Sequence, residues 1–224
     1  MTPADSWLRF NQMVRLISDG DDLRSAGPSI EEDRAAIADR IRLERFHRDR
    51  RRWDELADDY VEDSRVKTTW FEGTGRAFAE ASRDMAQRGR ESIHLIAPTD
   101  IRINGDRATC ESHAQILNRS VVHGVEVDMT QYCRFFSRLV RTPDGWRLAS
   151  FDGIYNKDTI VPVRPGEEVP IDWDALRELR PSYRIWAYAI GLKGYEIGQD
   201  ELGDDRPDLL EPFYADAYGW LAEG

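Results

Sequence analysis

A long run of strand-like sequence in the middle of the chain is the feature that most constrains its fold. Short turn signals, among them Asn104-Gly105 and Asp144-Gly145, divide this run into four segments rich in β-branched and aromatic residues. The four segments are residues 93–103, 107–119, 125–141 and 146–155. Asn-Gly and Asp-Gly favour the tight turns of β-hairpins, and strands joined by such turns pair antiparallel. The sequence therefore predicts a meander of four long strands, with His123-Gly124 as its middle turn.

Helical patterns precede these strands. Ser29 followed by Glu32 is a capping box, and the apolar spacing after it predicts a helix that ends near Arg48. Three further elements are predicted in chain order: a helix at 53–60, a strand at 64–71 and a helix at 76–88. Helices followed by a meander indicate an α+β domain in which one curved antiparallel sheet wraps around the N-terminal helices.

The chain is long enough for one ordinary domain with additions. We assign residues 29–158 to that domain, residues 1–28 to an N-terminal helical extension and residues 159–224 to a C-terminal extension. Two helical patterns, near 173–192 and 207–221, and many aromatic side chains characterise the C-terminal extension. Leaving such side chains in water forgoes about 1.5–3 kcal/mol each. We therefore expect this extension to close a pocket or to bury an interface between subunits.

Composition excludes several classes of protein. The net charge of −11 at pH 7 argues against nucleic acid or an anionic membrane as the main partner. No apolar run approaches the roughly 20 residues needed to span a bilayer, and the N-terminus lacks the pattern of a signal peptide. Cys110 and Cys133 lie in strand-like sequence without CxxC spacing, which is typical of buried thiols in a reducing compartment. These features predict a cytoplasmic protein.

Five arginines gather where the first predicted helix ends: Arg45, Arg48, Arg50, Arg51 and Arg52. Positive side chains there complement the negative end of the helix dipole, which is a sufficient structural explanation. The alternative is functional. In that interpretation one of these arginines faces the mouth of a pocket and attracts an anionic or phenolic substrate.

Asp49 and His94 are the candidate catalytic residues, one at a helix end and one on the first strand of the meander. Side chains alternate along a strand, so His94 points away from an apolar set, Ile93, Leu95 and Ala97, which is expected to pack on a core. A carboxylate that meets the imidazole in an apolar pocket fixes its tautomer and raises its basicity. Such a dyad abstracts protons without metal or cofactor. The structural alternatives are a helix-capping aspartate and a packed histidine.

His113 is a third candidate, placed by the register of the first hairpin. If the turn pairs Ile103 with Asp106, His113 lies opposite Ile96. His94 and His113 then share a face as diagonal neighbours, although a one-residue bulge would reverse the parity. Two histidines and a carboxylate could also bind a metal. No recognisable ligand motif supports that interpretation, and we expect no metal site.

The last hairpin adds residues of a predicted pocket wall. Pairing Arg141 with Trp146 sets its register, aligns Tyr132 with Tyr155, and places Arg134 on the same face. An arginine among aromatic side chains suits a holder for an anion or oxyanion, whereas an exposed strand arginine is the plain alternative. Other aromatic side chains either belong to the core or line the pocket. The predicted substrate-binding residues are Tyr60, Trp70, Tyr132, Arg134, Phe151 and Tyr155.

Four short segments carry a resemblance to a known family: HRDRRRWDEL at 47–56, ESIH at 91–94, INGDRA at 103–108 and RTPDGWRL at 141–148. Over roughly residues 30–158 the chain resembles the SnoaL-like branch of the NTF2-like superfamily. That branch includes scytalone dehydratase, bile-acid dehydratases, hexachlorocyclohexane dehydrochlorinase and polyketide cyclases. The resemblance implies a cone-shaped α+β fold with one deep pocket. It also matches Asp49 and His94 to the catalytic dyad of the dehydratase and dehydrochlorinase members.

The chain departs from that family in two respects. Phe151 stands where the dehydrochlorinase has a pocket arginine, and the C-terminal extension is far longer than in the small members. Substrate identity therefore does not carry over from the resemblance.

The predicted function is that of a cofactor-independent lyase. His94, oriented by Asp49, would remove a proton from a bulky aromatic or polycyclic substrate, and a leaving group such as water would depart with help from His113, Tyr132 or a bound water. A carbon–carbon lyase that releases formaldehyde from a lignin-derived diaryl compound, an isomerase and a cyclase are alternatives within the same chemistry. A non-catalytic binding module and the small subunit of an oxygenase are alternatives outside it. The expected partners are a small apolar substrate and further copies of the chain, as a homodimer or homotrimer.

Overall fold

The structure is a computed structural model that describes residues 28–89, 92–194, 197–198 and 200–224. By the contacts among its residues the chain divides into two units, Met1–Asp33 and Arg34–Gly224. The helix predicted within residues 1–28 lies outside the described residues. The sheet and the cavity described below belong to the larger unit.

The first described helix, α2 (Ile30–Asp49), begins with the predicted capping box. The backbone N–H of Ser29 donates to Oε2 of Glu32 at 2.7 Å, and the N–H of Glu32 donates to Oγ of Ser29 at 3.3 Å. Two free N–H groups at the start of the helix are thereby satisfied. The helices α3 (Trp53–Asp58) and α4 (Gly75–Gln87) confirm the next two predictions.

One curved sheet of six strands forms the framework, in the order β2-β1-β6-β5-β4-β3. The strands are β1 (Tyr60–Thr68), β2 (Phe71–Gly73), β3 (Ile93–Asn104), β4 (Arg107–Val122), β5 (Val125–Thr142) and β6 (Gly145–Pro162). The meander β3–β6 is antiparallel as predicted, but β1 pairs in parallel with β6, so the sheet is mixed. The segment predicted as one early strand forms the antiparallel pair β1 and β2. Strand β6 continues past residue 158, where the domain was predicted to end.

The predicted turns lie at the ends of the long strands, and their backbone explains the residues that form them. Gly105 and Gly145 have φ angles of +55° and +96°, a region that glycine adopts without steric cost. At the middle turn His123 itself has a φ of +49° beside Gly124. Both central residues of that turn are thus left-handed, as a tight hairpin turn requires.

The predicted register of the first hairpin was wrong. Ile103 lies opposite Ala108 rather than Asp106, and the pairing shifts again between Pro98 and Asp100. Proline has no N–H to donate to the ladder and is confined to edge strands and bulges, which fits its place here in the edge strand β3. As a result His113 lies opposite Ala97, on the face of the sheet away from His94.

A similar shift changes the last hairpin. Arg141 pairs with Trp146 as predicted, but the register slips between Arg138 and Leu139, and Cys133 rather than Tyr132 lies opposite Tyr155. Because neighbouring residues of a strand point to opposite faces, the one-residue slip changes which residues share a face between Arg138 and Cys133. A second shift follows between Cys133 and Tyr132.

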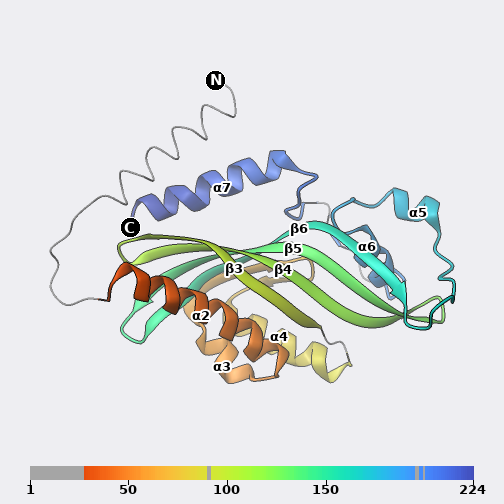
Figure 1. The fold of residues 1–224 in the computed structure, drawn as a ribbon, viewed down its shortest axis with the longest axis horizontal. Coiled ribbons are helices and arrows are strands. Elements are labelled where there is room, and N and C mark those ends of the chain that lie inside the picture. The colour runs from red at the N-terminus through yellow and green to blue at the C-terminus, as the bar shows by residue number, and fades with distance from the viewer. Residues whose placement is uncertain (1–27, 90–91, 195–196, 199) are drawn as a thin grey trace. The chain divides into compact units, whose positions relative to one another are not determined.

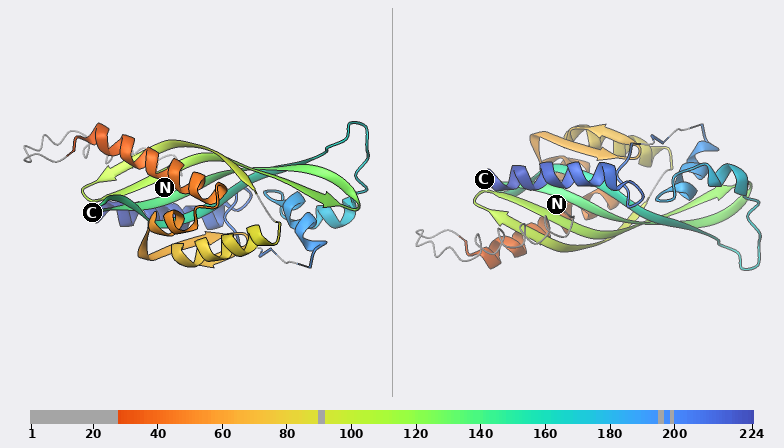
Figure 2. Two further views of the ribbon diagram at one scale, coloured as in Figure 1. Left: turned by 90° about the horizontal axis from the view of Figure 1, so that it is seen from below. Right: turned by 90° about the horizontal axis from the view of Figure 1, so that it is seen from above.

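Helices cover both faces of the sheet (Figure 1). The helices α2, α3 and α4 lie on one face, here called the inner face, and α7 (Pro207–Ala222) runs along the opposite, outer face, as both views of Figure 2 also show. The short helices α5 (Trp173–Arg177) and α6 (Arg184–Gly191) pack at the end of the sheet that carries the β4–β5 turn.

The aromatic C-terminal extension is packed against the sheet. On the outer face the ring of Phe136 contacts the rings of Phe213, Tyr214 and Tyr218 at centroid distances of 5.3, 5.8 and 6.1 Å. At the far end, Tyr188 and Leu176 pack with a group of buried apolar residues of β4 and β5. The extension therefore supplies cover to both ends and both faces of the sheet.

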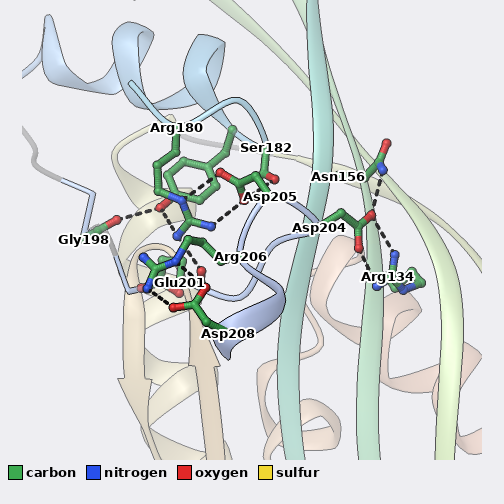
Figure 3. A network of polar contacts seen from close by, with 11 residues as sticks. Arg134, Asn156, Arg180, Ser182, Gly198, Glu201, Asp204, Asp205, Arg206 and Asp208 are labelled. Atoms are coloured by element: carbon green, nitrogen blue, oxygen red, sulfur yellow. Dashed lines mark hydrogen bonds and ion pairs between the residues drawn. The ribbon is translucent and has the colours of Figure 1, made fainter. Parts of the chain in front are cut away.

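A network of polar contacts fixes the segment between α6 and α7 (Figure 3). Arg180 donates two hydrogen bonds to Asp205, at 3.0 and 2.6 Å, and a third to the backbone carbonyl of Glu201 at 2.6 Å. The same segment pairs with β6, because the N–H of Tyr155 donates to the carbonyl of Leu202 at 3.0 Å. Bidentate pairing of this kind orients a loop as well as stabilising it.

One apolar set did not behave as predicted. Ile93 and Leu95 do not pack on a core: their exposed fractions are 61% and 55%, on the outer face of the edge strand β3. His94, between them, faces inward as predicted. An exposed apolar pair on an edge strand suits contact with a second copy of the chain, and the homodimer or homotrimer stays a prediction.

Two helical glycines provide a matched test of packing. A Cβ on Gly75 would lie 2.7 Å from Cδ1 of Tyr60, whereas a Cβ on Gly219 in α7 would meet nothing within 4 Å. We expect Gly75→Ala to destabilise the protein by about 1–3 kcal/mol through overpacking. Gly219→Ala should stabilise it by about 0.5–1 kcal/mol through helix propensity. Urea unfolding of both variants measures the difference, and equal stabilities would contradict the packing around Tyr60.

Candidate active site

A cavity of about 690 Å³ lies against the inner face of the sheet. Its wall is formed by residues of the helices α2, α4 and α6 and of the strands, and it combines aromatic with polar side chains. The aromatic lining residues are Trp70, Phe78, Phe135, Phe151, Tyr155 and Trp186. Polar side chains on the wall include His94, Arg45 and Arg48. A cavity of this size that offers both ring surfaces and polar groups can bind a small molecule.

Asp49 and His94 meet at this cavity. Oδ1 of Asp49 lies 2.7 Å from Nδ1 of His94, and Oδ2 accepts the backbone N–H of the same histidine at 2.7 Å. The carboxylate thus holds both the ring and the backbone of His94, and it does so from the last residue of α2. The side chains are 11% and 4% exposed, so the pair is shielded from solvent.

This geometry sets the tautomer of the imidazole. An ionised carboxylate only accepts hydrogen bonds, so Nδ1 must carry the proton and Nε2 must be the basic nitrogen. Within the described part of the chain, nothing hydrogen-bonds Nε2 of His94. The arrangement therefore presents an unprotonated nitrogen to a molecule in the cavity.

The pKa values favour that protonation state. Burial lowers the pKa of His94 to about 4, although the hydrogen bond that His94 donates to Asp49 works to raise it. The positive charges of Arg48 and Arg45 act in the same direction as burial. Burial works to raise the pKa of Asp49, but the hydrogen bonds and charge of His94 lower it overall. At neutral pH the pair is therefore a carboxylate and a neutral imidazole.

Beside the dyad lies a buried ion pair. Arg45 forms a bidentate hydrogen-bonded ion pair with Glu44, and the hydroxyl of Tyr60 donates to Oε1 of Glu44 at 2.7 Å. Glu44 and Arg45 are 2% and 4% exposed. The guanidinium of Arg45 also lies 4.4 Å from the centre of the Phe151 ring. The guanidinium and the carboxylate therefore each have hydrogen-bond partners, without which their burial would destabilise the fold.

The structure separates the predicted pocket residues into two groups. Trp70, Phe151 and Tyr155 line the cavity. Tyr60 is buried beneath it, on Glu44, and does not line it.

Three further candidates lie on the outer face, where the register shifts place them. His113 is exposed there. Arg134, expected to hold an anion, donates instead to Glu111 at 2.6 Å and to Asp204 at 2.8 and 3.0 Å (Figure 3). Tyr132 lies beside Lys157, whose Nζ is 5.1 Å from the ring centre. None of the three lines the cavity.

The alternative interpretation of the basic cluster, that one of its arginines faces a pocket, agrees with the structure, in which Arg45 and Arg48 line the cavity. Arg45, Arg48 and Asp49 have the spacing i, i+3, i+4, which places them on one face of a helix. That spacing was a usable signal, because it groups two arginines of the basic cluster with the candidate carboxylate. A second Asp–His pair was missed: Nδ1 of His47 lies 2.8 Å from Oδ2 of Asp59, but neither residue lines the cavity.

Helix α6 closes one side of the cavity. Trp186 and Lys193 contribute to its wall, the N–H of Trp186 donates to Asp158 on β6 at 2.7 Å, and Lys193 donates to Ser120 on β4 at 2.6 Å. Trp186 in the helix and Lys193 just after it thus connect this part of the chain to β6 and to β4. This contact favours the role of a pocket cover for this part of the C-terminal extension.

Metal sites and membrane-spanning helices are the other features to consider. Among the described residues, no group of three or more His, Cys, Asp or Glu side chains has an arrangement that could hold a metal ion. Nor is any helix in the described ranges long and apolar enough to cross a membrane.

A curved sheet wrapped over N-terminal helices, with an enclosed cavity on its inner face, defines the NTF2-like class of α+β fold. The chain belongs to the family of the SnoaL-like domain, whose model matches residues 31–152. The predicted resemblance is thereby confirmed at the level of family and fold.

Individual relatives agree with this assignment. The chain is 30% identical over 157 residues to pea pathogenicity protein 2 of Fusarium vanettenii, a match that covers 66% of each chain, just under two thirds of the relative's length. It is also 30% identical over 193 residues to an uncharacterized protein of Emericella nidulans, covering 78% of this chain and 80% of that one.

A solved structure shares the fold. It comes from Novosphingobium aromaticivorans, and its name assigns it provisionally to the scytalone dehydratases. The TM-score is 0.50 at 22% sequence identity, and the match covers 60% of this chain and 93% of the other.

Two truncations separate the roles of α6 and α7. A chain that ends at Pro165 loses α5 to α7, opens the cavity and exposes apolar residues of β4 and β5. A chain that ends at Arg206 loses only α7 and keeps the cover of the cavity. The probe is 1-naphthol, a small aromatic molecule. We expect the shorter chain to bind it at least about tenfold more weakly than the full chain. The longer chain should bind it normally but be less soluble. Calorimetric titration measures both, and full affinity in the shorter chain would contradict the cover.

The lowered pKa of His94 predicts a pH-dependent stability. The unfolded chain protonates this histidine near pH 6.5, whereas the folded chain does so only near pH 4. Stability from His94 is therefore present above pH 6.5 and is lost as the pH falls. Between pH 7 and 5 the loss should be about 2 kcal/mol.

Unfolding of wild type and His94→Gln at both pH values measures this loss. Burial raises the pKa of Glu201 to about 7, so the contribution of Glu201 to stability increases as the pH falls from 7 to 5. This contribution is the same in both proteins. The difference between them isolates His94. The same pH dependence in both proteins would contradict a neutral, buried imidazole.

Proposed function

We propose that this protein is a cofactor-independent lyase of the dehydratase type, acting on an aromatic or polycyclic small molecule. The observation that carries the proposal is the pair of hydrogen bonds that His94 donates to Asp49, which leaves Nε2 unprotonated at the wall of a cavity with several aromatic side chains. A base of this kind suits removal of a proton from carbon. The family adds support, since one structural relative has a name that places it among dehydratases.

The proposed reaction is an elimination of water from a β-hydroxy ketone. Nε2 of His94 takes the proton from the carbon next to the carbonyl, and the electron pair of that C–H bond forms an enolate. The enolate then collapses to restore the carbonyl and form the new C=C bond as the C–O bond breaks. The hydroxide leaves with a proton from the imidazolium or from a bound water. His113 and Tyr132 lie on the outer face, so neither is assigned this acid role.

The cavity argues for an enzyme rather than a supporting subunit. A subunit without a substrate would fill its pocket with its own side chains, but this cavity has a volume of about 690 Å³. Its aromatic wall suits a flat, apolar molecule, because ring contacts stabilise bound aromatic groups.

The test uses 3-hydroxy-1-tetralone, a bicyclic β-hydroxy ketone whose loss of water gives 1-naphthol. Asp49→Asn and His94→Gln should each lower kcat/KM by at least about 10²-fold, as expected when a general base is misoriented or removed. His113→Gln, on the outer face, is the matched control and should keep wild-type turnover. Absorbance of the naphthol product follows the reaction.

Wild-type rates in Asp49→Asn or His94→Gln would contradict the proposal. If elimination from this probe is slow even in the wild type, exchange of its C2 hydrogens in D2O, followed by NMR, gives the same comparison at the proton-transfer step.

A further inference from the structure

Two guanidinium groups on α2 reach the cavity wall, and they differ in how well they are paired. Arg45 forms a bidentate ion pair with the carboxylate of Glu44, which also accepts a hydrogen bond from the hydroxyl of Tyr60. Arg48 has no comparable partner. Its Nη1 donates to Oγ of Ser92 at 3.0 Å, and this is its one hydrogen bond to the described residues.

The carboxylate nearest to Arg48 is already in use. Oδ1 of Asp49 lies 3.9 Å from Nη1 of Arg48, beyond hydrogen-bond distance. Both oxygens of Asp49 accept hydrogen bonds from His94 instead. The positive charge of Arg48 is therefore only weakly compensated within the part of the chain that the structure describes.

Burial makes this incomplete pairing significant. The side chain of Arg48 is 10% exposed, and its Nε is buried without a hydrogen-bond partner among the described residues. Aromatic rings surround the group: its Cζ lies 5.7 Å from the ring centres of both Trp70 and Phe78. An unsatisfied buried donor destabilises a fold, so its presence calls for an explanation other than packing.

We propose that Arg48 binds an electron-rich oxygen of the substrate, namely the carbonyl or phenolic oxygen beside the carbon from which His94 removes a proton. This rests on the proposed function. When the proton passes to Nε2, the electron pair of the broken C–H bond moves toward the carbonyl, and the oxygen gains negative charge. A guanidinium already in place stabilises that charge without rearrangement.

The substrate class follows from this assignment. It is an aromatic or bicyclic molecule with a ketone or a phenolic oxygen, held so that the oxygen faces Arg48 and the acidic C–H faces His94. A hydrocarbon or a halogenated ring without such an oxygen would leave the guanidinium unpaired and should be a poor ligand. Arg134, the arginine predicted to hold an anion, cannot do so, since it pairs with Glu111 and Asp204.

The charge on Arg48 also couples substrate binding to the base. Its positive charge is one cause of the lowered pKa of His94, and burial together with Arg45 lowers the pKa of Arg48 itself to about 10. A negative oxygen beside Arg48 would compensate that charge. The imidazole then accepts a proton more readily as the enolate forms.

The test uses 1-naphthol, whose ionised form mimics the enolate and is distinguished by its absorbance. Because His94 could itself take the naphthol proton, the measurement is made in the His94→Gln background. At pH 7.5 the ratio of ionised to neutral bound naphthol should be at least about tenfold higher with Arg48 present than after Arg48→Gln. Arg48→Lys should recover part of the effect, and Arg42→Gln, an exposed arginine of the same helix, should change nothing.

An unchanged ratio after Arg48→Gln, or no binding of 1-naphthol to either protein, would overturn the proposal. Failure of the proposed function has a different signature: His94→Gln would then keep its turnover while the naphthol titration still reported on Arg48.

Thermal stability separates a binding role from a structural one. Arg48→Met removes the charge and the unpaired Nε but keeps an apolar stem among the aromatic rings. It should melt at or above the wild-type temperature while the naphthol ionisation is lost, because replacing a poorly paired buried charge by an apolar group is often stabilising. A large drop in Tm would show that Arg48 supports the fold, and would overturn its assignment to the substrate.

Discussion

The double hydrogen bond between Asp49 and His94 joins the two halves of the architecture. It links the last residue of α2 to an edge strand of the sheet, and it does so through both the ring and the backbone of the histidine. The carboxylate thereby fixes the position of β3 relative to the helix as well as the tautomer of the imidazole. The same contact that orients the imidazole also joins the helix to this edge of the sheet, so the geometry of the pair and the local packing cannot vary independently.

Buried charge at the end of α2 has to be balanced for this arrangement to persist. Glu44 and Arg45 compensate each other, and the ring of Phe151 lies against the guanidinium. The positive charge at the cavity thus comes from the helix, and a flat ring from the strand lies against it.

Local signals in the sequence predicted much of the fold. The capping box at Ser29, the three hairpin turns and the inward direction of His94 depend on a few neighbouring residues, and each was found in the structure. The faces of later strand residues depend on register over a whole hairpin. One shift near Pro98 and one near Arg138 were enough to move His113 and Arg134 to the outer face. Nothing in the local sequence fixes such a shift, because it depends on how the two strands and the helices beneath them pack.

Two parts of the candidate site were predicted only as alternatives: the C-terminal extension as a pocket cover, and an arginine of the basic cluster at the pocket mouth. The cover reaches the cavity through contacts of Trp186 with Asp158 and of Lys193 with Ser120, which are distant from each other in the sequence. Arg48 becomes significant only because neighbouring groups are already paired, which no spacing rule records. The contribution of each depends on which groups lie close together in the folded protein and which of them are already paired. The lowered pKa of His94 is of the same kind, because burial and two nearby arginines cause it. In the proposed reaction, a substrate oxygen that gains negative charge would compensate Arg48 and raise this pKa. Proton transfer to His94 would then be tied to molecules that can form an enolate or phenolate.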